Sequence, residues 1–581
     1  MHSIRGVVGI AAALVAACGL AGCAGMRAGD PVAPQSFDLI VRHGTVYDGT
    51  GAPGRQADVG VRGDRVVAVG DLSQARSAIE IDATGRAVSP GFINVLSWAN
   101  VSLIADGRGM SDLKQGVTLE IFGEGESGGP LNEEMKAELA SRQGDIRYDV
   151  EWTTLGEYLD TLVRRGVSPN VASFVGATTV REYVLGEDDR DPGPAELARM
   201  QELVREAMRE GALGVGSSLI YAPAFFAETP ELVALVQAAA EYGGGYVSHL
   251  RNESHRLVAA LDELIAITRA AGVHGEIYHL KAAGEANWGN MAVAIAQIDA
   301  ARATGASVGA NMYTYTAGST GLDASMPLWV QAGGTEAWVA RLKDPALRAQ
   351  VIADMRSPPA GQENLYRTAG SPDRVKFVAF RNPALKHLTG KTLAEVMAQR
   401  GTSAEDTMID LVIEDQSRVQ CVYFLMSEAN VRLGLAQPWV SLGSDAEARA
   451  PEGVFLKSST HPRAYGNFAR LLGRYVRDEQ VLTLPDAIHR LTGLPARNWK
   501  LEGRGCLAAN CHADLVVFDP ATIADRATYD EPAQYAVGVE HVLVNGVPVI
   551  RNGEHTGAKP GRVVRGPGYT ALTRPAADLS R

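Results

Sequence analysis

Two histidines and one aspartate stand where a hydrolytic metal site would need them. His249 and His279 each end a short apolar run, and Asp445 ends a third such run nearer the C-terminus. Imidazole nitrogen binds zinc readily, and a carboxylate beside the metal can take a proton from the attacking water. A single histidine at a strand end is most often structural. Two on neighbouring strands, together with an aspartate, indicate metal-assisted hydrolysis.

These three residues can meet only if their apolar runs lie side by side in one sheet. Eight such runs occur, several of them separated by segments with apolar residues at helical spacing, as in 257–271 and 291–303. Buried strands that alternate with helices predict a (β/α)8 TIM-type barrel over residues 90–499, with functional side chains at the carboxyl ends of the strands. A doubly wound sheet is the structural alternative, but no Gly-x-Gly-x-x-Gly motif follows a strand. The runs begin at Phe92, Val117, Val171, Leu213, Tyr246, Glu276, Val308 and Trp439.

One part of the barrel region does not follow this alternation. The stretch 318–382 is rich in Gly, Pro and polar residues, and we predict an irregular, lid-like insertion there. The apolar run 421–426 exceeds the count of eight strands. We therefore assign it to an insertion as well.

Both ends of the chain show the pattern of short strands. Residues 37–89 contain short apolar runs separated by Gly and Asp turns, and the same pattern returns within 500–565. Alternation with regular turns predicts antiparallel sheet. We assign residues 566–581 to a tail that follows this second group of strands.

The first residues have the layout of an export signal. Arg5 precedes an apolar run that is too short to span a bilayer, and Leu-Ala-Gly-Cys ends at Cys23. This tetrapeptide resembles a bacterial lipobox, which implies a lipoprotein signal peptide over 1–22, a lipid on Cys23 and a linker over 23–36. Because Ala24 follows Cys23, the resemblance implies an anchor in the outer membrane that faces the periplasm. A chance cysteine in an ordinary signal peptide is the alternative.

Charge and cysteine content narrow the possible partners. The sequence has 55 Lys and Arg against 67 Asp and Glu, and the net charge of −12 argues against binding to nucleic acid. Three cysteines follow Cys23, and no Cys-x-x-Cys pair indicates a zinc knuckle. A disulfide between Cys506 and Cys511 is possible in an oxidising compartment.

In their order and spacing, the motifs of this chain resemble those of the amidohydrolase superfamily, and within it the D-aminoacylase (N-acyl-D-amino-acid deacylase) group. The resemblance covers nearly the whole chain after residue 37. It implies that 37–89 and 500–565 form one composite β-sandwich beside the barrel, and that the substrate is a small N-acyl-D-amino acid. The segments that carry it are 38–51, 90–93 (Pro-Gly-Phe-Ile), 248–253, 278–281, 315–320, 443–445 (Gly-Ser-Asp), 461–466 (His-Pro-Arg-Ala-Tyr-Gly) and 513–519.

The chain departs from the family at two metal-binding positions. Where the superfamily has His-x-His on the first barrel strand, this chain has Leu96 and Trp98, neither of which offers a ligand atom. Where D-aminoacylases have a cysteine after the second strand, Glu124 is the best substitute, although the alignment could slip to Glu126. Glu124 and the two histidines would form a His2Glu set, which suits a catalytic zinc with an open position. We therefore predict one Zn²⁺ per chain.

The resemblance also implies roles in the reaction. Asp445 would accept a proton from the attacking water and then deliver it to the leaving amine. The free carboxylate of an N-acyl amino acid calls for cationic and hydroxyl donors. His461 could instead be an additional metal ligand. The candidates for binding the substrate, each of which could instead anchor a loop, are Lys281, Tyr313, Ser319 and Arg463.

Two other functions remain open. Residues 125–129 match Gly-x-Ser-x-Gly between a strand and a helix, so Ser127 could be the nucleophile of a serine hydrolase. Loss of His-x-His could also leave a catalytically silent, periplasm-facing binding protein. The retained histidines and aspartate argue against that function, because a silent site has no physical need for them.

Overall fold

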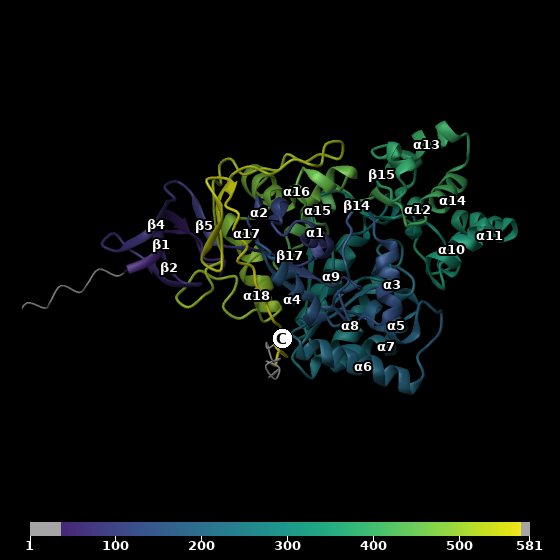
Figure 1. The fold of residues 1–581 in the computed structure, drawn as a ribbon, viewed down its shortest axis with the longest axis horizontal. Helices are drawn as coiled ribbons and strands as arrows, with labels where there is room; N and C mark the ends of the chain where they lie inside the picture. Colours follow the sequence, from purple (N-terminus) through teal and green to yellow (C-terminus); the bar gives the residue numbers. More distant parts are fainter. Residues whose placement is uncertain (1–35, 571–581) are drawn as a thin grey trace, which may run out of the picture.

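Parallel strands at the eight predicted positions form the central barrel of the molecule (Figure 1). Each begins within one residue of its expected start. The third position is divided at Phe174, so that its first part pairs with the second strand and its second part pairs with the fourth. The predicted barrel is therefore confirmed. Its strands are β6 (Phe92–Asn94), β7 (Val117–Phe122), β8 (Asn170–Ser173), β9 (Val175–Gly176), β10 (Gly214–Ser218), β11 (Gly245–His249), β12 (Gly275–Ile277), β13 (Val308–Met312) and β17 (Val440–Leu442).

The barrel closes through the segments that follow its first and last strands. The backbone N–H of Val95 donates to the carbonyl of Leu442 at 3.4 Å, and Ser97 forms a parallel bridge with Ala446. This closure places the ends of β6 and β17 side by side.

The structure is a computed structural model, and it describes residues 36–570. The predicted signal peptide, Cys23 and the residues after 570 lie outside this range. Within it, no helix has both the length and the apolar character needed to cross a membrane.

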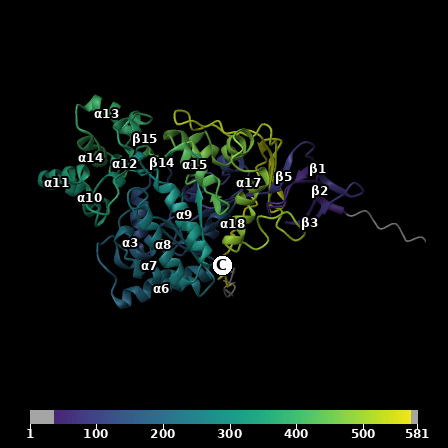
Figure 2. The ribbon, with the colours of Figure 1, turned by 180° about the vertical axis from the view of Figure 1, so that it is seen from behind.

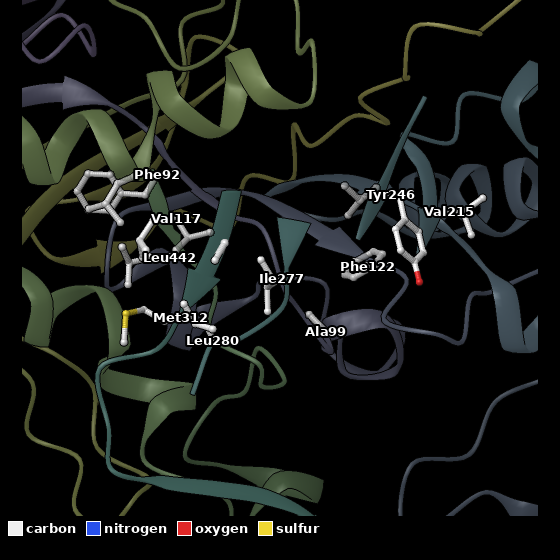
Figure 3. Packing of buried hydrophobic residues seen from close by; sticks show 14 of the residues in the cluster. Phe92, Ala99, Val117, Phe122, Val215, Tyr246, Ile277, Leu280, Met312 and Leu442 are labelled. Carbon is white, nitrogen blue, oxygen red and sulfur yellow. The ribbon is translucent and has the colours of Figure 1, made fainter. Parts of the chain in front are cut away.

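Apolar side chains from separate strands pack together on the outer face of the barrel, where the helices cover it. Figure 3 shows Phe92, Ile277, Met312 and Leu442 in this cluster, and each of them is almost fully buried. Strands covered on both faces need such runs, which explains why they could be found in the sequence. Truncating a buried leucine to alanine in such a core typically costs about 2–5 kcal/mol.

Helices surround the strands (Figures 1 and 2). The helix over 257–271 shows why: its buried positions recur at three- and four-residue spacing, so one face packs on the barrel. The helices of the barrel region are α1 (Ala99–Ala105), α2 (Met110–Leu113), α3 (Glu133–Arg142), α4 (Leu155–Arg165), α5 (Ala177–Leu185), α6 (Pro194–Arg209), α7 (Thr229–Ala240), α8 (Leu257–Ala271), α9 (Asn290–Ala303), α15 (Glu428–Leu435), α16 (Arg463–Arg470), α17 (Leu484–Leu491) and α18 (Gly493–Asn498).

The two ends of the chain form one sheet at one end of the molecule (Figures 1 and 2). The two halves join where residues 87–90 pair antiparallel with 515–518. All nine strands belong to a single hydrogen-bonded sheet, because the first strand pairs with the fourth over its first half and with the fifth at its end. The strands are β1 (Ser36–Val46), β2 (Arg55–Arg62), β3 (Arg65–Gly70), β4 (Arg76–Asp82), β5 (Ala87–Pro90), β18 (Leu515–Phe518), β19 (Val539–Val544), β20 (Val547–Arg551) and β21 (Glu554–His555). Nearby, Cys506 and Cys511 form a disulfide.

The insertion differs from the irregular lid that we predicted over 318–382. It is an ordered unit with its own buried core, which projects from the barrel at the end opposite the terminal sheet (Figures 1 and 2). The predicted extra strand, 421–426, lies at the centre of its antiparallel sheet, so the unit extends well beyond residue 382. Its elements are β14 (Ala317–Gly321), α10 (Gly334–Lys343), α11 (Pro345–Arg356), α12 (Leu365–Ala369), β15 (Val375–Ala379), α13 (Leu393–Arg400), α14 (Ala404–Asp415) and β16 (Gln420–Phe424).

The prediction of an irregular segment was wrong because Gly and Pro act here at helix ends. Pro345 occupies the first turn of α11, and Gly401 caps α13 with a φ of 68°. Both are positions at which these residues favour a helix boundary. Composition alone does not distinguish such boundaries from a loop.

Candidate metal centre

A tight turn after β7 directs Glu124 into the mouth of the barrel. Gly123 and Gly125 flank it with φ angles of 107° and 77°, a conformation that favours glycine. A Cβ atom at Gly123 would lie 2.5 Å from the carbonyl oxygen of Phe174, so the chain approaches closely as well. The carboxyl of Glu124 is buried, whereas Glu126 is exposed.

The two histidines lie at the carboxyl ends of β11 and β12. His249 is the last residue of β11, and His279 lies two residues after β12. His279 has a φ of 35°, and its backbone N–H donates to Oδ1 of Asn311 at 2.9 Å. A left-handed conformation at a histidine is uncommon and is often found at functional sites.

Glu124, His249 and His279 come together as a metal-binding triad. Oε1 of Glu124 lies 3.2 Å from Nδ1 of His249 and 2.8 Å from Nε2 of His279. One ligand atom from each residue can be chosen so that all three lie within 4.8 Å of one another. A carboxylate oxygen with two imidazole nitrogens is a donor set that fits zinc. The geometry selects Glu124 over Glu126.

Glu253 lies behind both histidines, and its role was missed in the sequence. Its Oε1 atom is 3.0 Å from Nδ1 of His279, and its Oε2 atom is 3.5 Å from Nε2 of His249. A carboxylate on the far nitrogen of a ligating histidine fixes its tautomer and orientation. The segment 248–253 belongs to the motif that identified the family, but only the folded loop brings Glu253 back to the imidazoles.

Lys281 is engaged by the same carboxylate. Its ammonium donates to Oε1 of Glu253 at 2.6 Å and lies 2.7 Å from Nδ1 of His279. We expected Lys281 to face the carboxylate of the substrate. Although it lines the cavity, its charge is already balanced by Glu253.

Opposite charges outweigh burial at Glu124 and His279, whereas burial holds the pKa of His249 below its usual value. Burial disfavours the ionised form of Glu124, but the charges of His279 and His249 and their hydrogen bonds hold its pKa well below the usual range. Burial and Lys281 oppose protonation of His279, whereas Glu253 and Glu124 favour it and raise its pKa to about 9. The carboxylates therefore stay ionised, as metal ligands and their supports must.

Asp445 faces the triad from the last strand. It follows β17 with a φ of 51°, and its backbone N–H donates to the carbonyl of Leu96 at 2.9 Å. Its Oδ2 atom is 2.8 Å from Nη1 of Arg463, and its Oδ1 atom accepts a hydrogen bond from the indole of Trp98 at 3.2 Å. Burial raises the pKa of Asp445, and Arg463 offsets part of this effect. A raised pKa suits a carboxyl that must take and return a proton.

A cavity of about 730 Å³ connects these groups to the surface, between the barrel and the insertion. The candidate substrate-binding residues Tyr313, Ser319 and Arg463 all line it. The guanidinium of Arg463 lies 4.5 Å from the centre of the Tyr313 ring, and its Nε atom has no hydrogen-bond partner in the described part of the chain. Ser319 donates to the carbonyl of Cys421 at 2.9 Å.

Two sequence-based alternatives fail on their hydrogen bonds. Nδ1 of His461 accepts from the backbone N–H of Arg463, and Nε2 lies 2.9 Å from the carbonyl of Ala317, so His461 has no free nitrogen for a metal. The hydroxyl of Ser127 donates to the carbonyl of Gly129 at 2.6 Å and accepts from the backbone N–H of Gly176. Within residues 36–570 no histidine bonds to this hydroxyl, and Ser127 does not line the cavity. The serine-hydrolase prediction is therefore wrong.

Comparison with known proteins places the chain in a family. Residues 80–550 match the Amidohydrolase family. The chain belongs to the amidohydrolase family. This amidohydrolase is 34% identical to the D-aminoacylase of Alcaligenes xylosoxydans xylosoxydans, across 91% of this chain and 98% of the relative. It is 33% identical to the N-acyl-D-glutamate deacylase of the same organism, across 91% and 97%.

Solved structures agree with this assignment. The amidohydrolase superposes with a TM-score of 0.76 on the N-acyl-D-glutamate deacylase of Bordetella bronchiseptica, at 30% identity, across 92% of this chain and all of the other. That enzyme was solved with zinc and a phosphonate inhibitor that mimics the tetrahedral intermediate. A D-aminoacylase structure gives a TM-score of 0.75 at 34% identity, across 91% of this chain and all of the other, and its metal centre is described as binuclear.

Proposed function

We propose that this amidohydrolase uses one Zn²⁺ per chain to hydrolyse the amide bond of N-acyl-D-amino acids, releasing a carboxylate and a free D-amino acid. The observation that carries the proposal is the buried triad of Glu124, His249 and His279, which faces Asp445 in one cavity. The D-configuration is supported by the names of the similar enzymes, which act on N-acyl-D-amino acids.

The chemistry divides between the metal and the protein. A bound zinc ion polarises a carbonyl group and lowers the pKa of water, which gives a nucleophile at neutral pH. Asp445 removes the proton of the attacking water and passes it to the amine as the C–N bond breaks. Because the side chain of Asp445 is only 11% exposed and pairs with Arg463, it is held in the cavity close to the reacting atoms.

The substrate carboxylate needs a cation of its own. Arg463 offers Nε, which has no hydrogen-bond partner in the described part of the chain, next to the ring of Tyr313. A guanidinium can hold a carboxylate through two parallel hydrogen bonds. We assign Arg463 the main part in binding, with Tyr313 and Ser319 beside it. Lys281 would also bind the substrate carboxylate if its ammonium contacted Glu253 and the substrate at the same time.

The experiment compares Glu124→Gln with Glu126→Gln on N-acetyl-D-amino acids and their L-enantiomers. Both substitutions remove one carboxylate from the same turn, but only Glu124 points at the histidines. We expect Glu124→Gln to lose zinc and at least about 100-fold in kcat/KM, because the metal activates the water. Glu126→Gln should keep both. Equal effects of the two variants would reject this ligand set, and wild-type enzyme that binds zinc without turnover would favour a silent binding protein.

We also propose that the chain is a lipoprotein of the cell envelope. The proposal rests on the first 23 residues of the sequence and agrees with the disulfide between Cys506 and Cys511, since such bonds persist in oxidising compartments. Labelling with a radioactive fatty acid should mark the wild-type chain and leave Cys23→Ser unlabelled. Equal labelling would reject a lipid on Cys23.

A further inference from the structure

Trp98 enters the metal centre through the closure of the barrel. Its backbone N–H donates to the carbonyl of Ala446 at 2.9 Å, and two residues earlier Leu96 accepts from the N–H of Asp445. Leu96 is buried against Gly443, where a Cβ atom would lie only 2.6 Å from the Leu96 side chain. The first and last strands thus hold the indole of Trp98 beside Asp445.

The indole N–H of Trp98 stands between two carboxylates. Nε1 lies 2.8 Å from Oε2 of Glu124 and 3.2 Å from Oδ1 of Asp445. The other oxygen of Glu124 faces the two histidines, and the other oxygen of Asp445 faces Arg463. Each carboxylate therefore uses one oxygen for a basic side chain and the other for Trp98.

Such an arrangement solves an electrostatic problem. Two ionised carboxylates in a buried site repel each other unless a cation or a donor lies between them. In a binuclear centre a second metal ion can provide that charge. An indole carries one N–H donor and no acceptor, so it can bridge two oxygens but cannot bind a metal.

We propose that Trp98 is a positioning residue, which fixes the metal-ligating carboxylate of Glu124 and the proton-transfer carboxyl of Asp445 through one shared N–H. It acts through these two side chains and does not touch the reacting atoms. The inference rests on the zinc site of the proposed function, and for the role of Asp445 it rests on the proposed reaction as well.

The test removes the N–H and keeps the ring. Trp98→Phe and Trp98→β-(3-benzothienyl)alanine both lack the donor, and the second keeps the shape of the indole. Trp329→Phe is the matched control, because Trp329 is also partly buried and its Nε1 donates to a carboxylate, Asp354, at 2.8 Å outside the cavity. Zinc dissociation constants are measured by competition with a chelator, and kcat and KM are measured at saturating zinc.

We expect both Trp98 variants to bind zinc about 10- to 100-fold more weakly, as is typical when a support of a metal ligand is removed. kcat should fall while KM changes little, because Asp445 acts on the water and not in binding the substrate. The Trp329 control should match the wild type. If the benzothienyl variant keeps wild-type zinc affinity and kcat, the shape of the ring matters and the proposal is overturned.

Failure of the proposed function gives a different result from failure of the Trp98 proposal. Wild-type enzyme that hydrolyses none of the N-acyl-D-amino acids would reject that function. The comparison of zinc affinity among Trp98→Phe, the benzothienyl variant and Trp329→Phe needs no turnover. It would still decide whether Trp98 positions Glu124.

Discussion

Glu253 lies directly behind His279, with its Oε1 atom 3.0 Å from Nδ1 of the imidazole. This leaves Nε2 of His279 facing Glu124 at 2.8 Å, on the side where a metal would bind. The same carboxyl reaches within 3.5 Å of Nε2 of His249. A single buried residue outside the metal-binding triad thus lies beside the far nitrogen of both histidines.

Replacing Glu253 by glutamine should weaken zinc binding by about 10- to 100-fold, because the histidines lose the carboxylate that fixes them. Chelator competition measures this. Glu276→Gln is the control: Glu276 is also buried, and its Oε1 atom lies 3.2 Å from Nε2 of His274, away from the cavity. If both variants bind zinc like the wild type, Glu253 does not orient the ligands.

Asp445→Asn should lower kcat by about 10²- to 10⁴-fold, the usual contribution of a general acid–base group, while zinc stays bound. Asp525→Asn provides the comparison, since Asp525 pairs with an arginine, Arg470, at 3.0 Å and does not line the cavity. Metal analysis and steady-state kinetics on the same samples separate the two effects. Loss of zinc from Asp445→Asn would assign Asp445 to the metal instead.

Ser127→Ala should leave kcat/KM unchanged. The hydroxyl of Ser127 links two backbone groups, so its loss costs about 1 kcal/mol of folding free energy and no catalysis. Urea denaturation and amide hydrolysis measure the two quantities. Inactive but folded Ser127→Ala would restore the serine-hydrolase mechanism.

The functional residues that could be found from the sequence are those at the ends of strands. His249, His279 and Asp445 follow apolar runs, and such runs reveal buried parallel strands. Glu253 and the indole of Trp98 could not be assigned, because their partners are brought close only by the fold. Trp98 was considered only as a position that lacked a ligand atom.

The insertion shows a second limit of sequence patterns. Its strand β16 was found because it is apolar, but its helices are short and are bounded by Gly and Pro. Short helices depend on tertiary packing more than on local propensity. Their existence therefore becomes evident only with the separate core that they share.

Two buried acids on β7 and α2, Glu120 and Asp112, should make stability depend on pH. Burial raises the pKa of Glu120 from 4.5 to about 7, and burial with the nearby charge of Glu120 raises that of Asp112. The folded chain therefore holds a proton that the unfolded chain releases. The stabilisation is complete below pH 4.5 and is lost as the pH rises through about 7. Urea midpoints across this range should fall less steeply with rising pH for Glu120→Gln than for the wild type, and parallel curves would contradict the raised pKa of Glu120.

Zinc content and amidase activity, measured on one preparation that begins after Cys23, test the central claim most directly. N-acetyl-D-amino acids and their L-enantiomers are assayed before chelation, after it, and after zinc is returned. We predict about one zinc per chain and D-selective hydrolysis that disappears with the metal and returns with it. Metal-free protein that hydrolyses the D-substrates at the original rate would contradict the account.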